Sequence, residues 1–218
     1  MKRIRCVFTA ATFAGLLVLA GCGSRSSPSA SGTTGETRTP EPPQAKEPVL
    51  YTGQEAFTRM MGNARRWTVD AVPVHLESEL TSEANGQGGK SAVWRAYVAS
   101  PSRNKVKTFV CSGSRLPDAP PWGVSWASID RPLIAQFAAL VFEPLLFKID
   151  SDRAYSVALQ HGGAALLKKN PKQPVTYVLE WNPKDRVLIW HVIFGPKLAD
   201  AKGVGAINAT TGIFIWAK

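Results

Sequence analysis

The sequence predicts an α+β protein made of two units, each a helix followed by antiparallel strands. Capping signals at Thr52 and at Asp150 each precede residues with helical apolar spacing. Alternating apolar runs, separated by turn residues, follow each predicted helix. When Trp94 is placed over Trp190, residues 74–79 align with 175–180, which indicates an internal repeat.

The first unit is predicted to occupy residues 51–114. Thr52 followed by Glu55 is a capping box, so a helix begins there and is expected to end at Gly62 and Asn63. Alternation predicts a strand over 72–80 and further strands over 91–100 and 106–111. The first of these strands is predicted to place a mainly apolar set of side chains on one face and a polar set on the other. The polar set is His75, Glu77 and Glu79.

Residues 115–149 are predicted to connect the two units. The stretch 116–126 is rich in Pro and Trp and is expected to be irregular. Asp130-Arg131-Pro132 is a typical helix start, and an apolar stripe continues it over 132–142. Such a helix could lie on a membrane surface, but it lacks the basic polar face of membrane-surface helices. We therefore predict a core helix that bridges the two units.

The second unit is predicted over residues 150–218. A helix begins at Asp150 or Ser151 and is expected to stop at His161-Gly162-Gly163. Strands are predicted over 175–181, 187–194, 204–209 and 213–217. The strand 187–194 is apolar on both faces. A sheet covered by helices on one side needs to bury only that side, so the other face is expected to meet the second unit or a partner.

Residues 1–21 have the layout of a secretory signal, with a basic start, a 15-residue apolar run from Cys6 to Ala20 and small residues at the exit. That run is shorter than the ~20 residues of a spanning helix. Leu19-Ala20-Gly21-Cys22 resembles the lipobox of bacterial lipoproteins. The resemblance implies that Cys22 carries the lipid anchor and becomes the first mature residue. In the lipoproteins of diderm bacteria, Asp directly after the lipidated cysteine favours retention in the inner membrane. Gly23 stands at that position here, so the resemblance implies an outer-membrane location, facing the periplasm, in a diderm bacterium.

Residues 22–50 are predicted to be a disordered tether, because Ser, Pro, Thr and Gly dominate and few large apolar residues are present. The whole chain has a formal net charge of +10, and removal of the signal with its three basic residues leaves +7. A basic surface suits anionic lipid, polysaccharide or acidic proteins. Export argues against nucleic acid as a partner.

Four segments of the second unit, AYSVAL (154–159), YVLEW (177–181), WHVIFG (190–195) and INATTG (207–212), resemble PepSY or PepSY-like domains. That family has one helix followed by antiparallel strands and an Asp-Ala-x-Thr-Gly-type turn near its end. Asn208 stands here where Asp is usual. The resemblance covers residues 150–218 well and 51–114 less closely. It implies protein binding, including protease inhibition, and supplies no catalytic residues.

The sequence shows no motif for catalysis, for a metal or for another cofactor. His75, Glu77 and Glu79 share a strand face, but neighbours there are ~6.5–7 Å apart, too far for one zinc ion. A solvated face that pairs with Arg95 explains the pattern better. Cys111 is the one cysteine left after Cys6 and Cys22 are assigned, and its strand context predicts a buried, inert thiol. The sequence therefore predicts a protein that is not an enzyme.

The predicted function is a lipid-anchored envelope protein that binds another protein, as a protease inhibitor or an assembly factor. The alternative is a lipoprotein carrier that holds an apolar or glycan ligand in a groove between the two units. Partner-binding candidates are Trp122, Trp126, Trp190 and His191. Tryptophans on loops are typical of binding hot spots, although Trp122 and Trp126 could instead cover the seam between the units.

Overall fold

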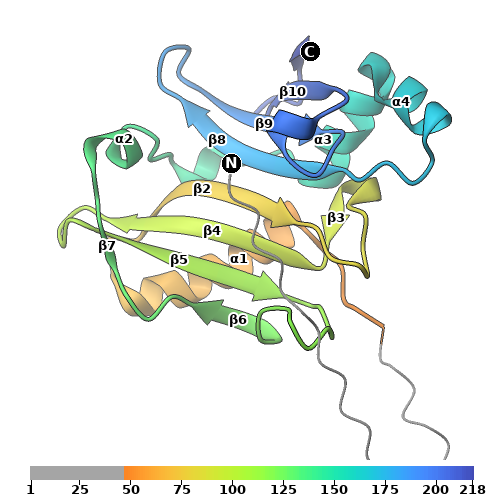
Figure 1. Cartoon of the computed structure of the whole chain (residues 1–218). Helices are drawn as coiled ribbons and strands as arrows, with labels where there is room; N and C mark the ends of the chain where they lie inside the picture. The colour runs from red at the N-terminus through yellow and green to blue at the C-terminus, as the bar shows by residue number, and fades with distance from the viewer. Residues whose placement is uncertain (1–46) are drawn as a thin grey trace, which may run out of the picture. The chain divides into compact units, whose positions relative to one another are not determined.

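The computed structural model describes residues 47–218 (Figure 1). The predicted signal peptide, Cys22 and the tether up to residue 46 lie outside the described residues. Residues 47–50, predicted as tether, already belong to the folded part, since Val49 N donates to Gly113 O at 2.9 Å. The described part combines helices with a nine-stranded antiparallel sheet, which confirms the α+β class. None of its helices is long and apolar enough to cross a membrane.

Helix α1 spans Gly53–Trp67, and the predicted capping box is confirmed. The Thr52 side chain accepts from the Glu55 amide, and the Thr52 amide donates to Glu55 Oε2 at 2.9 Å. The predicted end at Gly62 and Asn63 is wrong. Gly62 faces solvent, and glycine within a helix costs about 0.5–1 kcal/mol of stability relative to alanine. This cost is smaller than the gain from burying the rest of the apolar stripe of α1, so the helix continues.

The strands of the first half follow the predicted order. Their bounds are β1 Tyr51–Thr52, β2 Val72–Glu79, β3 Lys90–Ser91, β4 Val93–Ser100, β5 Lys105–Ser112 and β6 Gly123–Trp126. A 3-10 turn at Gln87–Gly89 precedes β3. The prediction that residues 116–126 are irregular is wrong for β6, which pairs with β5 through Ser112↔Gly123 to Phe109↔Trp126.

The connector does not contain the predicted helix over 132–142. Arg131–Pro132 forms strand β7, which pairs with β5, and helix α2 covers only Ala135–Ala138. A 3-10 turn follows at Pro144–Leu146. Asp130 is not a helix cap, because its carboxylate receives the Trp67 indole N–H and pairs with Lys107.

The second half begins with helix α3, Ser151–Ala158, capped by Asp150 as predicted. The predicted stop at His161-Gly162-Gly163 is wrong, because a π-helical turn at Leu159–Gly163 leads into helix α4, Ala164–Lys169. Gly162 takes φ +110°, a value that glycine adopts without strain. Four strands follow: β8 Thr176–Asn182, β9 Val187–Ile193, β10 Val204–Asn208 and β11 Phe214–Ala217. A 3-10 turn at Leu198–Asp200 lies between β9 and β10.

The main sheet has the order β11-β10-β9-β8-β2-β4-β5-β6, with β7 also on β5. The first long strand of each half meets the other at the centre, through the pairs His75↔Glu180, Leu76↔Leu179 and Glu77↔Val178. Register also agrees with the alignment of Trp94 with Trp190, because Ser78 pairs with Trp94 and Leu179 pairs with Trp190. Within the main sheet, each half thus has a helical segment followed by four successive neighbouring strands, β2-β4-β5-β6 in the first half and β8-β9-β10-β11 in the second.

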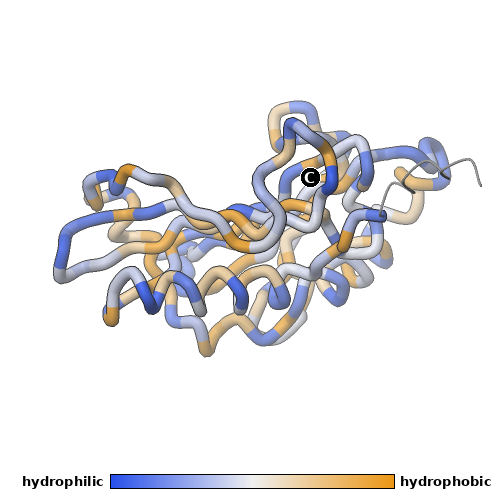
Figure 2. Tube along the Cα trace, turned by 90° about the horizontal axis from the view of Figure 1, so that it is seen from below, coloured by the Kyte–Doolittle hydropathy of each residue, from blue (hydrophilic) through white to orange (hydrophobic). Residues whose placement is uncertain are grey.

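Helices α1 and α3 both lie on one face of the sheet, called here the helix face (Figure 1). Figure 2 looks at the sheet from the β6 edge and shows the helices below it. The main core fills this layer, and its centre is an aromatic cluster of Trp94, Tyr177 and Trp190, with ring centroids 6.0–6.4 Å apart. The two halves therefore share one core.

The opposite face of the sheet, called here the open face, is partly covered by the connector. Its covering residues are Leu133, Phe137, Leu140 and Val141, which pack over Val74, Ala99 and Val106. A register irregularity in β2 between Pro73 and His75 lets Val74 join this cluster. On the first half, the chain itself thus covers this face. The expectation that the second face of strand 187–194 meets the other unit or a partner stays a prediction.

Candidate binding face

Polar side chains gather at the centre of the open face, where the two halves meet. Because side chains alternate along a strand, Glu77 on β2 lies on the same face as its cross-strand neighbour Arg95 on β4. Glu180 on β8 lies opposite His75, and His191 on β9 is one strand further. We call this set the central strip. Its members are His75, Glu77, Glu79, Arg95, Tyr97, Glu180 and His191.

The first half of the central strip is held by mutual pairing. His75 Nε2 donates to Glu77 Oε2 at 3.3 Å, and the Tyr97 hydroxyl donates to Glu77 Oε1 at 3.4 Å. Arg95 forms an ion pair with Glu79 and lies 3.9 Å from Glu77. The predicted pairing of this face with Arg95 is confirmed.

The second half of the strip has the matching pair, His191 Nε2 at 3.2 Å from Glu180 Oε1. Hydrogen bonds from the two histidines are the main reason that the pKa values of Glu77 and Glu180 lie below their ordinary 4.5, with partial burial opposing the shift. Both carboxylates are therefore ionised at neutral pH. The strip has three carboxylates and one guanidinium, so it is acidic within a basic protein.

A hollow of about 280 Å³ adjoins the strip on the open face. It is lined by Leu140 from the connector, by Glu180, Trp181, Asn182, Pro183, Ile189 and His191 from the β8–β9 hairpin, and by Trp216 from β11. Trp216 is 40% exposed, and its ring centroid lies 5.9 Å from that of His191. The hollow thus combines an exposed aromatic ring with a fixed carboxylate.

Neither a metal centre nor a reactive thiol is found among residues 47–218. Within residues 47–218, no group of three His, Cys, Asp or Glu side chains could hold a metal ion. Cys111 is buried on the helix face, and burial raises the pKa of its thiol to about 11. A thiol with that pKa is a poor nucleophile at neutral pH.

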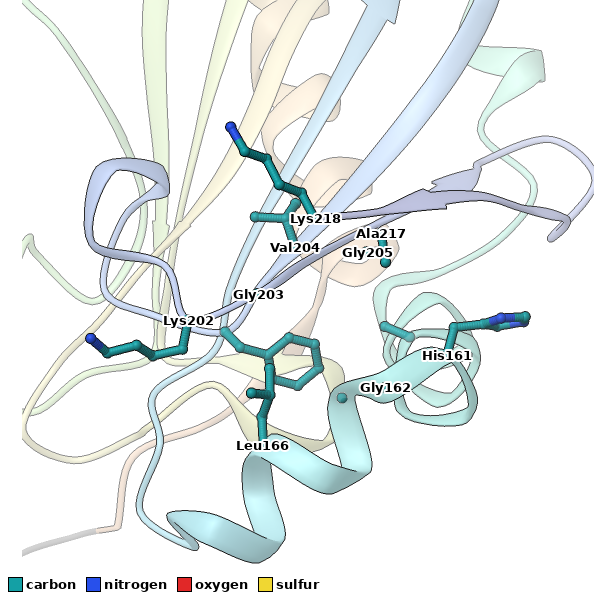
Figure 3. Close-up of a pocket in the computed structure, with 12 residues that line it drawn as sticks. His161, Gly162, Leu166, Lys202, Gly203, Val204, Gly205, Ala217 and Lys218 are labelled. Carbon is teal, nitrogen blue, oxygen red and sulfur yellow. The ribbon is translucent and has the colours of Figure 1, made fainter.

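A second hollow, of about 230 Å³, lies where the π-helical turn meets β10 and β11 (Figure 3). Glycines form much of its wall because helix and strand approach closely there. A Cβ at Gly163 would come within 2.2 Å of the Phe194 ring. The His161 ring stacks on Phe214 at 3.8 Å, and Lys202 and Lys218 extend in different directions (Figure 3). The polar groups of this hollow therefore do not converge on one point.

The structure separates the four predicted partner-binding residues. His191 belongs to the central strip, whereas Trp122 and Trp126 are exposed at the β6 edge. Trp190 is completely buried, and its indole N–H donates to Ile149 O at 2.8 Å. That burial leaves no surface for a partner, so the prediction does not fit Trp190.

Sequence reasoning did not single out Glu180 or Trp216. The signal for Glu180 was present, because the repeat alignment places it over Glu79, a member of the polar strand face. Trp216 could not be placed beside His191 from the sequence, since their proximity depends on the pairing of β10 with both β9 and β11.

Comparisons with known proteins give little further information. No family model matches the chain, so the resemblance to PepSY domains stays a prediction. No curated protein matches it. Among solved structures, the chain is similar to a protein from Clostridium difficile 630 described as a "putative lipoprotein (CD1622)". The match has 11% sequence identity and a TM-score of 0.46, and it covers 75% of this chain and 91% of that chain. A likeness at this level assigns neither a fold family nor an activity.

Proposed function

We propose that this chain is a non-enzymatic protein-binding module, held at the bacterial cell envelope by a lipid on Cys22. The observation that carries the binding proposal is the central strip with the adjoining hollow. The anchor rests on the lipobox resemblance and the signal layout of residues 1–21. The finer description, two PepSY-like units, is supported by the repeated order of a helical segment and four strands of the main sheet.

The central strip is suited to recognition because its charges are already in place. Its side chains project from strands at the middle of the sheet and are paired with each other. Little side-chain entropy is then lost when a partner binds. Exposed Trp216 beside this strip supplies the kind of aromatic anchor found at binding hot spots.

Charge indicates what the partner presents. Glu77, Glu79 and Glu180 outnumber Arg95, so a basic group on the partner gains attraction here and an acidic one is repelled. Leu140 and Trp216 offer apolar contact next to these carboxylates. We therefore expect a partner with Lys or Arg side chains beside an apolar or aromatic residue. A protease or an assembly component with such a surface fits.

The test is site-specific photo-crosslinking in cells of the organism, with the crosslinker in place of Trp216. A matched control carries it in place of Arg153, an exposed residue of α3 behind the sheet. We expect a protein crosslinked from position 216 only, and we expect Glu180→Lys to abolish the crosslink. A crosslink that is equal from both positions, or that survives Glu180→Lys, would contradict binding at the central strip.

A carrier function is the second candidate, and the aromatic hollow favours it. Trp181 and Trp216 could stack on a glycan or an apolar ligand, with Asn182 as a hydrogen-bonding group. The predicted groove between the units is absent from residues 47–218 in that form, because the two halves join edge to edge through β2 and β8. A lipid or glycan that copurifies with the protein and is lost in Trp216→Ala would favour the carrier.

A further inference from the structure

The β6 edge of the sheet exposes two tryptophans that the central strip does not use. Trp122 directly precedes β6 and Trp126 ends it, with exposed fractions of 42% and 54%. Ile129, 77% exposed, follows on the same segment. A strand at the border of a sheet thus carries a row of large apolar side chains in water.

Arginines accompany these side chains. The Arg115 guanidinium lies 3.3 Å from the centroid of the Trp122 ring. Helix α1, which packs beside β5 and β6, has three exposed arginines and one glutamate. The arginines are Arg59, Arg65 and Arg66. The combination of Trp rings with Arg side chains is typical of surfaces that contact anionic lipid headgroups.

The chain enters the folded part beside this edge. Val49 is hydrogen-bonded to Gly113, and the residue before Gly113, Ser112, pairs with Gly123 of β6. Val49 and Leu50 are themselves exposed apolar residues. In Figure 1 the entering segment and the loop between β5 and β6 lie on the same side of the sheet. A lipid on Cys22 would therefore draw the β6 edge, rather than the β11 edge, towards the membrane.

We propose that the β6 edge, through Trp122, Trp126 and Arg115, contacts the anionic headgroup region of the membrane that holds the lipid anchor. The inference rests on the proposed anchoring at Cys22. Each arginine near an anionic surface contributes about 1 kcal/mol. Contacts this weak hold the edge at the surface because the anchor keeps the protein at a high effective concentration there. Docking in this way leaves Glu180 and His191 of the central strip free for a partner, because β2, β4 and β5 lie between β8 and β6.

The experiment reproduces the anchor chemically. The mature-length chain is coupled through Cys22 to a maleimide lipid in vesicles of phosphatidylcholine and phosphatidylglycerol. Cys111 does not compete, because it is buried and the pKa of its thiol is raised to about 11. Quenching of tryptophan fluorescence by brominated lipid then reports which indoles reach the bilayer.

We expect brominated lipid to quench the native chain, and the double variant Trp122→Ala/Trp126→Ala to lose most of that quenching, because these are the exposed tryptophans of the β6 edge. The control Trp216→Ala, a similarly exposed tryptophan on the opposite edge strand, keeps it. Arg115→Gln retains every tryptophan and removes one positive charge, so in phosphatidylglycerol vesicles it is expected to weaken the docking equilibrium roughly fivefold and to reduce quenching accordingly.

Absence of quenching in the native chain, or equal loss in Trp216→Ala, would overturn the proposal. Unquenched Trp122 and Trp126 that crosslink to an envelope protein in cells would also overturn it, in favour of a protein partner. Chemical coupling makes the result independent of lipidation in cells. Failure of the proposed anchoring is seen separately, by fractionation of a Cys22→Ser strain.

Discussion

Replacement of Trp190 tests the assignment of this residue to the core rather than to a binding surface. Truncation of a buried tryptophan to alanine costs about 3–5 kcal/mol. The lost indole N–H leaves the Ile149 carbonyl without its donor, which adds roughly 1–3 kcal/mol. That sum approaches the whole stability of an ordinary domain, ~5–15 kcal/mol. We therefore expect Trp190→Ala to be largely unfolded or barely folded.

Trp190→Phe keeps the variant measurable, because it retains one aromatic ring while removing the N–H donor and part of the buried ring volume. We expect it to lower the free energy of unfolding by roughly 1–3 kcal/mol. The matched control is Trp216→Ala, which is exposed and should change stability by about 0.5 kcal/mol. Urea unfolding followed by far-UV circular dichroism measures both. If Trp190→Phe were as stable as Trp216→Ala, the hydrogen bond to Ile149 would not stabilise the fold and the core reasoning would fail.

Three further results are expected. Gly62→Ala should raise the free energy of unfolding by about 0.5–1 kcal/mol, since a Cβ there meets no atom within 4 Å. Gly89→Ala should lower the free energy of unfolding, because φ at Gly89 is +77° and the new Cβ would lie 2.2 Å from the Asp152 backbone. Urea melts compare the two variants. Because the pKa values of Glu77 and Glu180 are lowered in the native state, ionisation of these two groups stabilises the fold at pH values above their ordinary pKa of 4.5, and this contribution is lost as the pH falls below 4.5. The loss of stability between pH 6 and pH 3 should therefore be smaller in a Glu77→Gln/Glu180→Gln variant. An identical pH profile in the variant would contradict the pairing. The Cys22→Ser protein should be lost from the membrane fraction, while its folded part melts at the same temperature as in the native protein. A Cys22→Ser protein whose signal peptide is cleaved but which stays membrane-bound would show that lipid is not the anchor.

The elements that local sequence dictates were predicted well. Thr52 and Glu55 form a capping box from neighbouring residues alone, and the structure contains it. Alternation placed Glu77 on the face where it meets Arg95. The alignment of Trp94 with Trp190 agrees with the observed strand register. Each of these inferences uses residues that are close in the chain or equivalent in the repeat.

The misses come from contacts between distant residues. Asp130-Arg131-Pro132 has the composition of a helix start, but Asp130 is engaged by Trp67 and Lys107 and the next residues pair with β5. Gly163 looked like a helix stop, yet it permits close packing against Phe194, so the helix continues after a π-helical turn. The hollow beside His191 needs the connector and β11, which no local pattern could bring together.

The seam between β2 and β8 affects how the protein reaches its native state. Tyr177 N donates to the Ser78 hydroxyl across 99 residues of chain, whereas most other neighbours in the sheet are adjacent hairpins. Closing so long a loop is slow compared with hairpin formation, so the seam is expected to form late. Until β8 arrives, the first half has an unpaired β2 edge that a second copy could occupy. Exchange of β8 between two copies is therefore the misassembly that we expect, and the proposed anchor would increase this hazard by concentrating chains at a membrane.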